Sequence, residues 1–188
     1  MTLQAGISDA AAHGSAFTSY AAMNPQFAIT QTSGNPTSTA WPANNDAYAV
    51  PFLVASPVSF SGAFFGSGTS PGTTNFDIGI YRDDWTRITS LGATACVNNS
   101  QAMEPAAGGA AFASVVTLPR GRYYMAMSSA ATTLTVRGFA PVNQGCRILG
   151  MFKMASAHPL PDPFVPASMG TTAFIPVFGL IVSGASLA

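Results

Sequence analysis

Apolar and polar residues alternate over short stretches in the middle of the chain. Between residues 48 and 139 the β-prone runs are YAVPFLVA, VSFSGAFF, FDIGIY, TRITSLG, AAFASVVTL, RYYMAMS and TTLTVRGF, and Gly, Pro or Asn separates most of them. In FDIGIY, Phe76, Ile78 and Ile80 fall on one face of a strand, and the residues between them fall on the other. Short strands at this spacing predict an all-β sandwich or barrel. Of the two, we expect an antiparallel β-sandwich that is jelly-roll-like.

The N-terminal residues 1–45 show little of this periodicity. They are rich in Pro, Asn, Thr and Ser, which favour turns and extended segments. Their large apolar side chains are nevertheless too many for a disordered tail. We therefore expect an extended arm that lies on a neighbouring subunit or on a particle surface, for example by adding a strand to a sheet edge. The candidate anchoring residues are Phe17, Tyr20, Phe27 and Trp41.

Residues 46–188 are expected to form the β-sandwich domain. Its proline-rich stretch, residues 157–166, includes HPLPDPFVP, which has four Pro in nine residues and should run extended without ladder hydrogen bonds. The run TAFIPVFGLIVSG that follows is apolar enough to return as a last strand.

Charged residues are scarce, and they cluster. They make up 7% of the chain, against about 25% in an ordinary soluble domain. The stretch FDIGIYRDDWTRI contains five of the fourteen (seven basic plus seven acidic). Because Asp favours turns, the segment between the two strands predicts an exposed hairpin tip formed by Arg82, Asp83, Asp84 and Trp85. Two adjacent carboxylates on a turn lack the partly dry, concave setting that acid–base catalysis needs.

The charge content also bears on partners. A formal net charge of zero leaves a free monomer poorly protected against association, so we expect a homo-oligomer, with a trimer favoured. Seven scattered Lys and Arg cannot build the basic stripe of a nucleic-acid-binding protein.

The most apolar run has ten residues and contains a Pro, whereas a membrane-spanning helix needs roughly 20. The first residues lack the features of a signal peptide, so we expect synthesis in a host cytoplasm without secretion.

No motif indicates a reaction. Gly68–Gly72 matches G-x-S-x-G, but Pro71 follows the serine and has no N–H to offer an oxyanion. Cys96 and Cys146 do not have zinc-site spacing with the two His, and they can be buried thiols or a disulfide. We therefore expect no catalytic residue, no cofactor and no metal site, and hence no enzyme.

Four stretches occur in an informative order: YAVPF at 48–52, DIGIY with a polar turn at 77–84, LPRGRYYMAM at 118–127 and LPDPF at 160–164. Together they resemble the β-sandwich modules of tailed-bacteriophage virion proteins, which occur in tail fibres, head fibres and capsid decoration proteins. The resemblance covers residues 48–180 approximately, and LPDPF is the more specific of its motifs. These motifs are structural positions, so no catalytic residue carries over.

The resemblance implies a non-enzymatic virion component. The first interpretation is a capsid decoration, head-fibre or tail-associated subunit that binds major capsid or tail proteins through low-charge surfaces. The alternative is a tail-fibre-type host-recognition module that binds cell-surface glycans, with aromatic residues such as Tyr81, Trp85 or Tyr124 stacking on sugar rings. A secreted carbohydrate-binding domain is a third option, which the missing signal and linker oppose.

Overall fold

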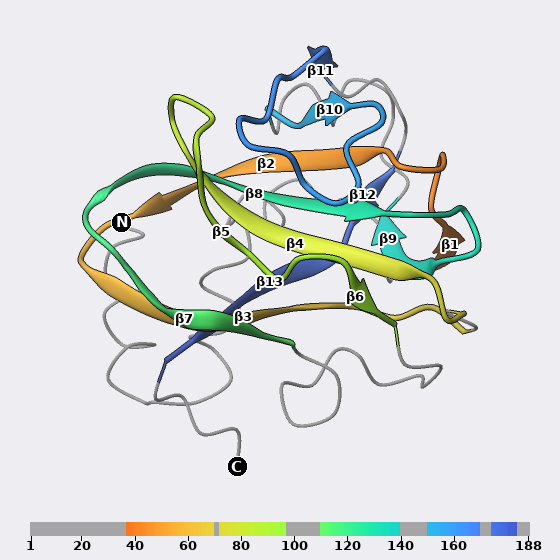
Figure 1. Ribbon diagram of the computed structural model, residues 1–188, viewed down its shortest axis with the longest axis horizontal. Helices are drawn as coiled ribbons and strands as arrows, with labels where there is room; N and C mark the ends of the chain where they lie inside the picture. The colour runs from red at the N-terminus through yellow and green to blue at the C-terminus, as the bar shows by residue number, and fades with distance from the viewer. Residues whose placement is uncertain (1–36, 70–71, 97–109, 140–149, 170–173, 184–188) are drawn as a thin grey trace, which may run out of the picture.

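The computed structural model describes residues 37–69, 72–96, 110–139, 150–169 and 174–183 (Figure 1). Within these ranges the chain forms β-strands without any helix, and each strand pairing is antiparallel. The strands are β1 Thr37–Ala40, β2 Ala47–Val54, β3 Val58–Phe65, β4 Asn75–Arg82, β5 Arg87–Ser90, β6 Thr94–Ala95, β7 Ala110–Leu118, β8 Gly121–Ser129, β9 Thr135–Phe139, β10 Phe152–Met154, β11 Ser168–Met169, β12 Ile175–Pro176 and β13 Phe178–Val182. The prediction of an all-β, antiparallel fold is confirmed.

The strands form one large sheet and two small ones. The seven-stranded sheet has the order β11-β10-β2-β8-β4-β5, with β6 also paired to β4. The three-stranded sheets have the orders β13-β3-β7 and β1-β9-β12. In Figure 1 the strands β2, β8 and β4 run across the upper part of the molecule, and β3, β7 and β13 lie below them. Gly66 connects the two small sheets, because its N–H donates to Val177 and its carbonyl accepts from Arg137.

The main core lies between these sheets. It contains the side chains that alternation assigned to one face of β4, namely Phe76, Ile78 and Ile80. Further large members come from both sides of the core, among them Tyr48, Val50, Phe52, Met125 and Met127 from the seven-stranded sheet, and Phe60, Phe65, Phe178 and Leu180 from the sheet opposite. Full burial of each such side chain contributes about 1.5–3 kcal/mol, so this core dominates the stability of the fold.

A second, smaller core covers the other face of the seven-stranded sheet. On that face the strands carry small residues, Ala47, Ala49 and Ala126, beside the rings of Tyr81 and Tyr124. The proline-rich residues 157–166, named here the strap, pack on it through three buried side chains, Ala157, Leu160 and Phe164. The strap belongs to no strand, as its prolines predict, and has cis peptide bonds before Pro159 and Pro163. The central strands are therefore buried on both faces.

The described part of the predicted N-terminal arm belongs to the folded domain. Strand β1 pairs with β9 over four residues. Trp41 is only 1% exposed, and its ring meets Tyr48 and Phe174 edge-on at centroid distances of 5.4 and 5.7 Å. Its Nε1–H donates to the carbonyl of Asp46 at 3.1 Å, so this large side chain is buried with its polar group satisfied.

Trp41 as an anchor for another surface is therefore a wrong prediction, and the folded domain begins by residue 37. The other predicted anchors, Phe17, Tyr20 and Phe27, lie outside the described residues. At the other end, the expected last strand is present as β13, which pairs with β3.

Candidate functional site: the charged hairpin and the strap

The hairpin predicted from the charge cluster connects β4 and β5. The N–H of Arg82 donates to the carbonyl of Thr86 at 2.9 Å, and the N–H of Trp85 donates to the carbonyl of Arg82 at 3.0 Å. Asp84 closes the turn, because its Oδ1 accepts from the hydroxyl and from the N–H of Thr86. These two hydrogen bonds, the hydroxyl one first, lower the pKa of Asp84 below its usual value. Arg82, Asp83 and Asp84 are exposed, as predicted.

Trp85 is not part of the exposed tip. It is half-buried, and its ring stacks on Tyr124 at 3.9 Å and on Phe164 of the strap at 5.4 Å. Its φ of 69° lies in the left-handed region, which is uncommon for a bulky residue and needs compensation from packing. The prediction fails here because the apolar ring gains more from stacking than from solvent exposure. Tyr81 and Tyr124, at 0% and 4% exposed, are likewise not free to stack on sugar rings.

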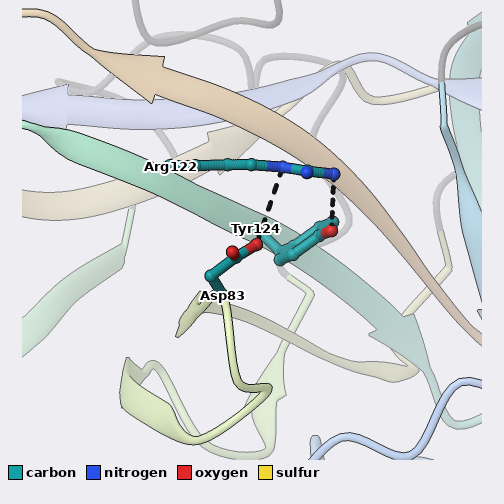
Figure 2. Close-up of polar contacts among 3 residues, drawn as sticks. All are labelled: Asp83, Arg122 and Tyr124. Carbon is teal, nitrogen blue, oxygen red and sulfur yellow. Dashed lines mark hydrogen bonds and ion pairs between the residues drawn. The ribbon is translucent and has the colours of Figure 1, made fainter.

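A polar cluster borders this stack, and Figure 2 shows its three residues. The extended side chain of Arg122 reaches between Asp83 and Tyr124. Its Nε lies 3.6 Å from Asp83 Oδ1, its Nη2 donates to Tyr124 Oη at 2.7 Å, and its guanidinium lies 5.2 Å from the Tyr124 ring centroid. Burial raises the pKa of Tyr124. Both ion-pair side chains are more than half exposed, so the pair contributes little stability but presents charge at the end of the sheet.

The rest of the charged stretch holds the strap. Among the described residues, five hydrogen bonds join the segment 77–87 to the strap: Leu160 N–H to Asp77 Oδ2 at 3.0 Å, Tyr81 Oη–H to the Pro161 carbonyl at 2.7 Å, Arg87 Nη1–H to the Leu160 carbonyl, Arg87 N–H to Asp162 Oδ1 at 2.9 Å, and Phe164 N–H to the Trp85 carbonyl at 3.0 Å. Gly79 lets the strap approach closely, since a Cβ there would lie 3.1 Å from Leu160 Cδ1 and 2.8 Å from the Thr89 carbonyl oxygen. Two of the five charged residues of this stretch, Asp77 and Arg87, thus form a structural clamp on the strap.

Asp77 is the buried member of this clamp. Its side chain is 0% exposed, and burial raises its pKa, against the lowering effect of the Leu160 N–H. The hydroxyl of Ser90 and the N–H of Gly92 lie near and also lower this pKa. Neither makes a well-formed hydrogen bond with Asp77 Oδ1, which has no partner of good geometry in the described residues. An incompletely satisfied buried carboxyl is costly, so Asp77 is a sensitive point of the domain.

Ser128 and His158 lie beside Asp77. Ser128 is the cross-strand neighbour of Asp77, and its Oγ lies 3.0 Å from His158 Nδ1. Burial lowers the pKa of His158, and the charge of Asp77 raises it. These are the residue types of a hydrolase triad, but Ser128 is 0% exposed and Asp77 accepts its described hydrogen bond from Leu160 rather than from the histidine. A substrate cannot reach such a serine, so the arrangement is not suited to nucleophilic catalysis.

An ion pair fixes the strap's N-terminal neighbour, β10. Lys153 Nζ lies 2.6 Å from Asp46 Oδ2, and the Asp46 side chain is 5% exposed. The hydrogen bond to Asp46 raises the pKa of Lys153. Sequence reasoning missed this pair because no pattern connects residues so far apart in the chain.

The described residues offer no grouping of three or more His, Cys, Asp or Glu side chains that could hold a metal ion. Nor do they include a helix of the length and apolarity needed to span a membrane. Cys96 is buried, and burial raises its pKa, while Cys146 lies outside the described residues together with Ser70 and Pro71 of the G-x-S-x-G match.

No protein-family model and no curated protein matches this chain. Two of the four quoted motifs contact each other in the structure. LPDPF is the part of the strap that binds DIGIY through the Tyr81–Pro161 hydrogen bond, and the second Tyr of LPRGRYYMAM, Tyr124, stacks on Trp85.

Proposed function

We propose that this chain is a non-enzymatic structural protein of a bacteriophage virion: a capsid decoration, head-fibre or tail-associated subunit built on a jelly-roll-like β-sandwich. One observation carries the proposal. The sheet β13-β3-β7 contains no charged residue in any of its three strands. Its strand β7 exposes Ala, Ser, Val and Thr side chains, including Val115 at 56% exposure. A free domain normally protects such a face with charge, so we assign it to contacts between subunits.

The charged residues elsewhere support a structural role. Asp77 and Arg87 hold the strap, and Asp46 pairs with Lys153. These groups stabilise the fold instead of converging on a reacting centre, which is what a catalytic site would require. The expected assembly is a homo-oligomer, with a trimer favoured, attached to major capsid or tail proteins.

Light scattering of the full chain tests the assembly. We expect a trimer at micromolar concentration, and we expect Val115→Lys on β7 to shift it towards monomer. Leu53→Lys is the matched control, because Leu53 is 75% exposed but lies on β2 of the other sheet. A well-behaved wild-type monomer, or equal dissociation by both variants, would contradict the assignment of this face.

A stained gel of intact virions tests the location. We expect a band of 19.2 kDa, with many copies for a decoration protein and few for a tail protein. Absence of the chain from purified particles would refute the virion role.

The alternative, a host-recognition module that binds glycans, is supported by the exposed Arg122 and Asp83 beside the half-buried Trp85. Binding to host-cell surfaces should then be lost in Arg122→Ala and kept in Arg120→Ala, a neighbouring exposed arginine in the turn before β8. Equal binding by both variants would exclude this site.

A further inference from the structure

The start of the strap places a half-buried histidine beside the buried polar residues Ser128 and Asp77. His158 contacts Ser128 of β8, and two residues later Leu160 donates its N–H to Asp77 of β4. Beneath the strap, Ala47, Ala49 and Ala126 are each 0% exposed. The strap has no ladder pairing of its own, so it is held by individual side-chain and backbone hydrogen bonds and by packing. Such a segment can detach without breaking the sheet.

We propose that the strap is a pH-sensitive latch, which opens when His158 takes up a proton and then exposes the alanine-lined face of the seven-stranded sheet. The charged and titratable groups around the strap come from several elements, and Tyr124 is the one on β8 that packs with it. Asp77 and Tyr81 belong to β4, Arg87 to β5 and Asp162 to the strap itself. Lys153 of β10 binds Asp46, the residue that precedes β2.

The direction of the pH response follows from the partial burial of the His158 ring. In the closed latch burial lowers the pKa of His158 below 6.5, so the closed state binds the proton less tightly than the open state does. Acidification through pH 6.5 therefore favours opening, until the pKa of the closed state is reached. Each unit of pKa depression changes the opening equilibrium about tenfold.

Asp77 acts in the opposite direction. Its pKa is raised in the closed latch, so its protonation favours closure, in the range between that raised value and its ordinary 3.8. Its negative charge also raises the pKa of His158, which limits the response of the histidine. Removing the charge of Asp77 should therefore strengthen acid-induced opening, whereas removing the titration of His158 should abolish it.

Hydrogen exchange of the strap amides tests the latch. The N–H groups of Leu160 and Phe164 are bonded to Asp77 and Trp85 in the closed state. After correction for intrinsic exchange rates, their protection in the wild-type full chain should fall about tenfold per unit of His158 pKa depression between pH 7.5 and 5.0. The amides of Met125 and Met127 in β8 should stay protected and serve as the internal reference.

Two variants separate this latch from general acid sensitivity. His158→Gln should show strap protection that is independent of pH over the same range, and Asp77→Asn should show a larger loss than the wild type. An equal fall in wild type and His158→Gln, or no fall in the wild type, would overturn the proposal. An NMR titration of the His158 ring in the wild-type protein tests the latch even if a variant fails to fold. A His158 pKa below 6.5 supports the latch, and a value at or above 6.5 refutes it.

Discussion

Phe164 is the side chain through which the strap should contribute most to stability. It is 1% exposed, and it packs against Tyr81 at 5.5 Å and Trp85 at 5.4 Å. Replacing a buried Phe by Ala costs about 3–5 kcal/mol, and each aromatic pair accounts for about 0.5–1.5 kcal/mol beyond area burial. Because the strap can detach instead of leaving a cavity, we expect Phe164→Ala to lower the free energy of unfolding by about 3 kcal/mol, at the bottom of that range.

Urea unfolding of the full chain measures this effect. Val165→Ala is the matched control, since its side chain is 60% exposed and its removal should change stability by less than about 0.5 kcal/mol. In thermal unfolding the Phe164 variant should melt about 6–12 °C lower, at about 2–4 °C per kcal/mol for a domain of this size. If the strap detaches in the variant, its m-value should also fall, because less surface remains to be exposed on unfolding. A loss below about 1 kcal/mol with an unchanged m-value would refute the clamped strap.

Three further outcomes are expected. Lys153→Met should lower the unfolding free energy by about 2–3 kcal/mol at pH 7, because it leaves Asp46 buried without a cation. Since the pKa of Lys153 is raised in the folded protein, wild-type stability should fall as the pH rises above 10.5. The same loss of stability at alkaline pH in the Lys153→Met variant would contradict the pairing. Asp83→Ala should cost about 0.2–1 kcal/mol in urea unfolding, and a difference that persists in about 1 M salt would show that the exposed ion pair is not its cause. Deletion of residues 1–36 should leave a folded domain that no longer assembles. Deletion through Trp41 should lower the free energy of unfolding by about 3–5 kcal/mol more, because it also removes a buried Trp side chain. If the two truncated proteins melt at the same temperature by circular dichroism, Trp41 lies outside the core.

The local patterns of the sequence predicted the longer strands and the turn, but not short strands such as β1 and β10. The period-two pattern correctly placed Phe76, Ile78 and Ile80 on one face of β4, and in the structure that face lies in the main core. The turn-forming character of Asp83 and Asp84 correctly placed the hairpin. Both features depend on contacts within a few residues or on the pleat of a single strand, which is the information that periodicity carries.

The two-faced burial of the large sheet could not be predicted in the same way. Asp77 interacts with Leu160, 83 residues away, and Trp41 packs on Phe174. No periodicity within a strand indicates that a distant segment will cover its second face. Trp41 therefore looked like an anchor in a proline-rich arm. A usable signal was present in β2, whose run AYAVPFLV is apolar at nearly every position, as expected for a strand covered on both sides.

Burial on both faces changes how strand register is specified. In most half-buried sheets, a slip of one residue is penalised because it exchanges apolar for polar positions. In β2 that penalty is small, and the two faces differ in side-chain volume instead: Tyr48, Val50 and Phe52 point into the main core, while Ala47 and Ala49 lie under the strap. A slipped strand would leave voids on one side and steric overlap on the other. The strap packs on the small side chains that this register presents, so its docking stabilises the aligned sheet relative to a slipped one.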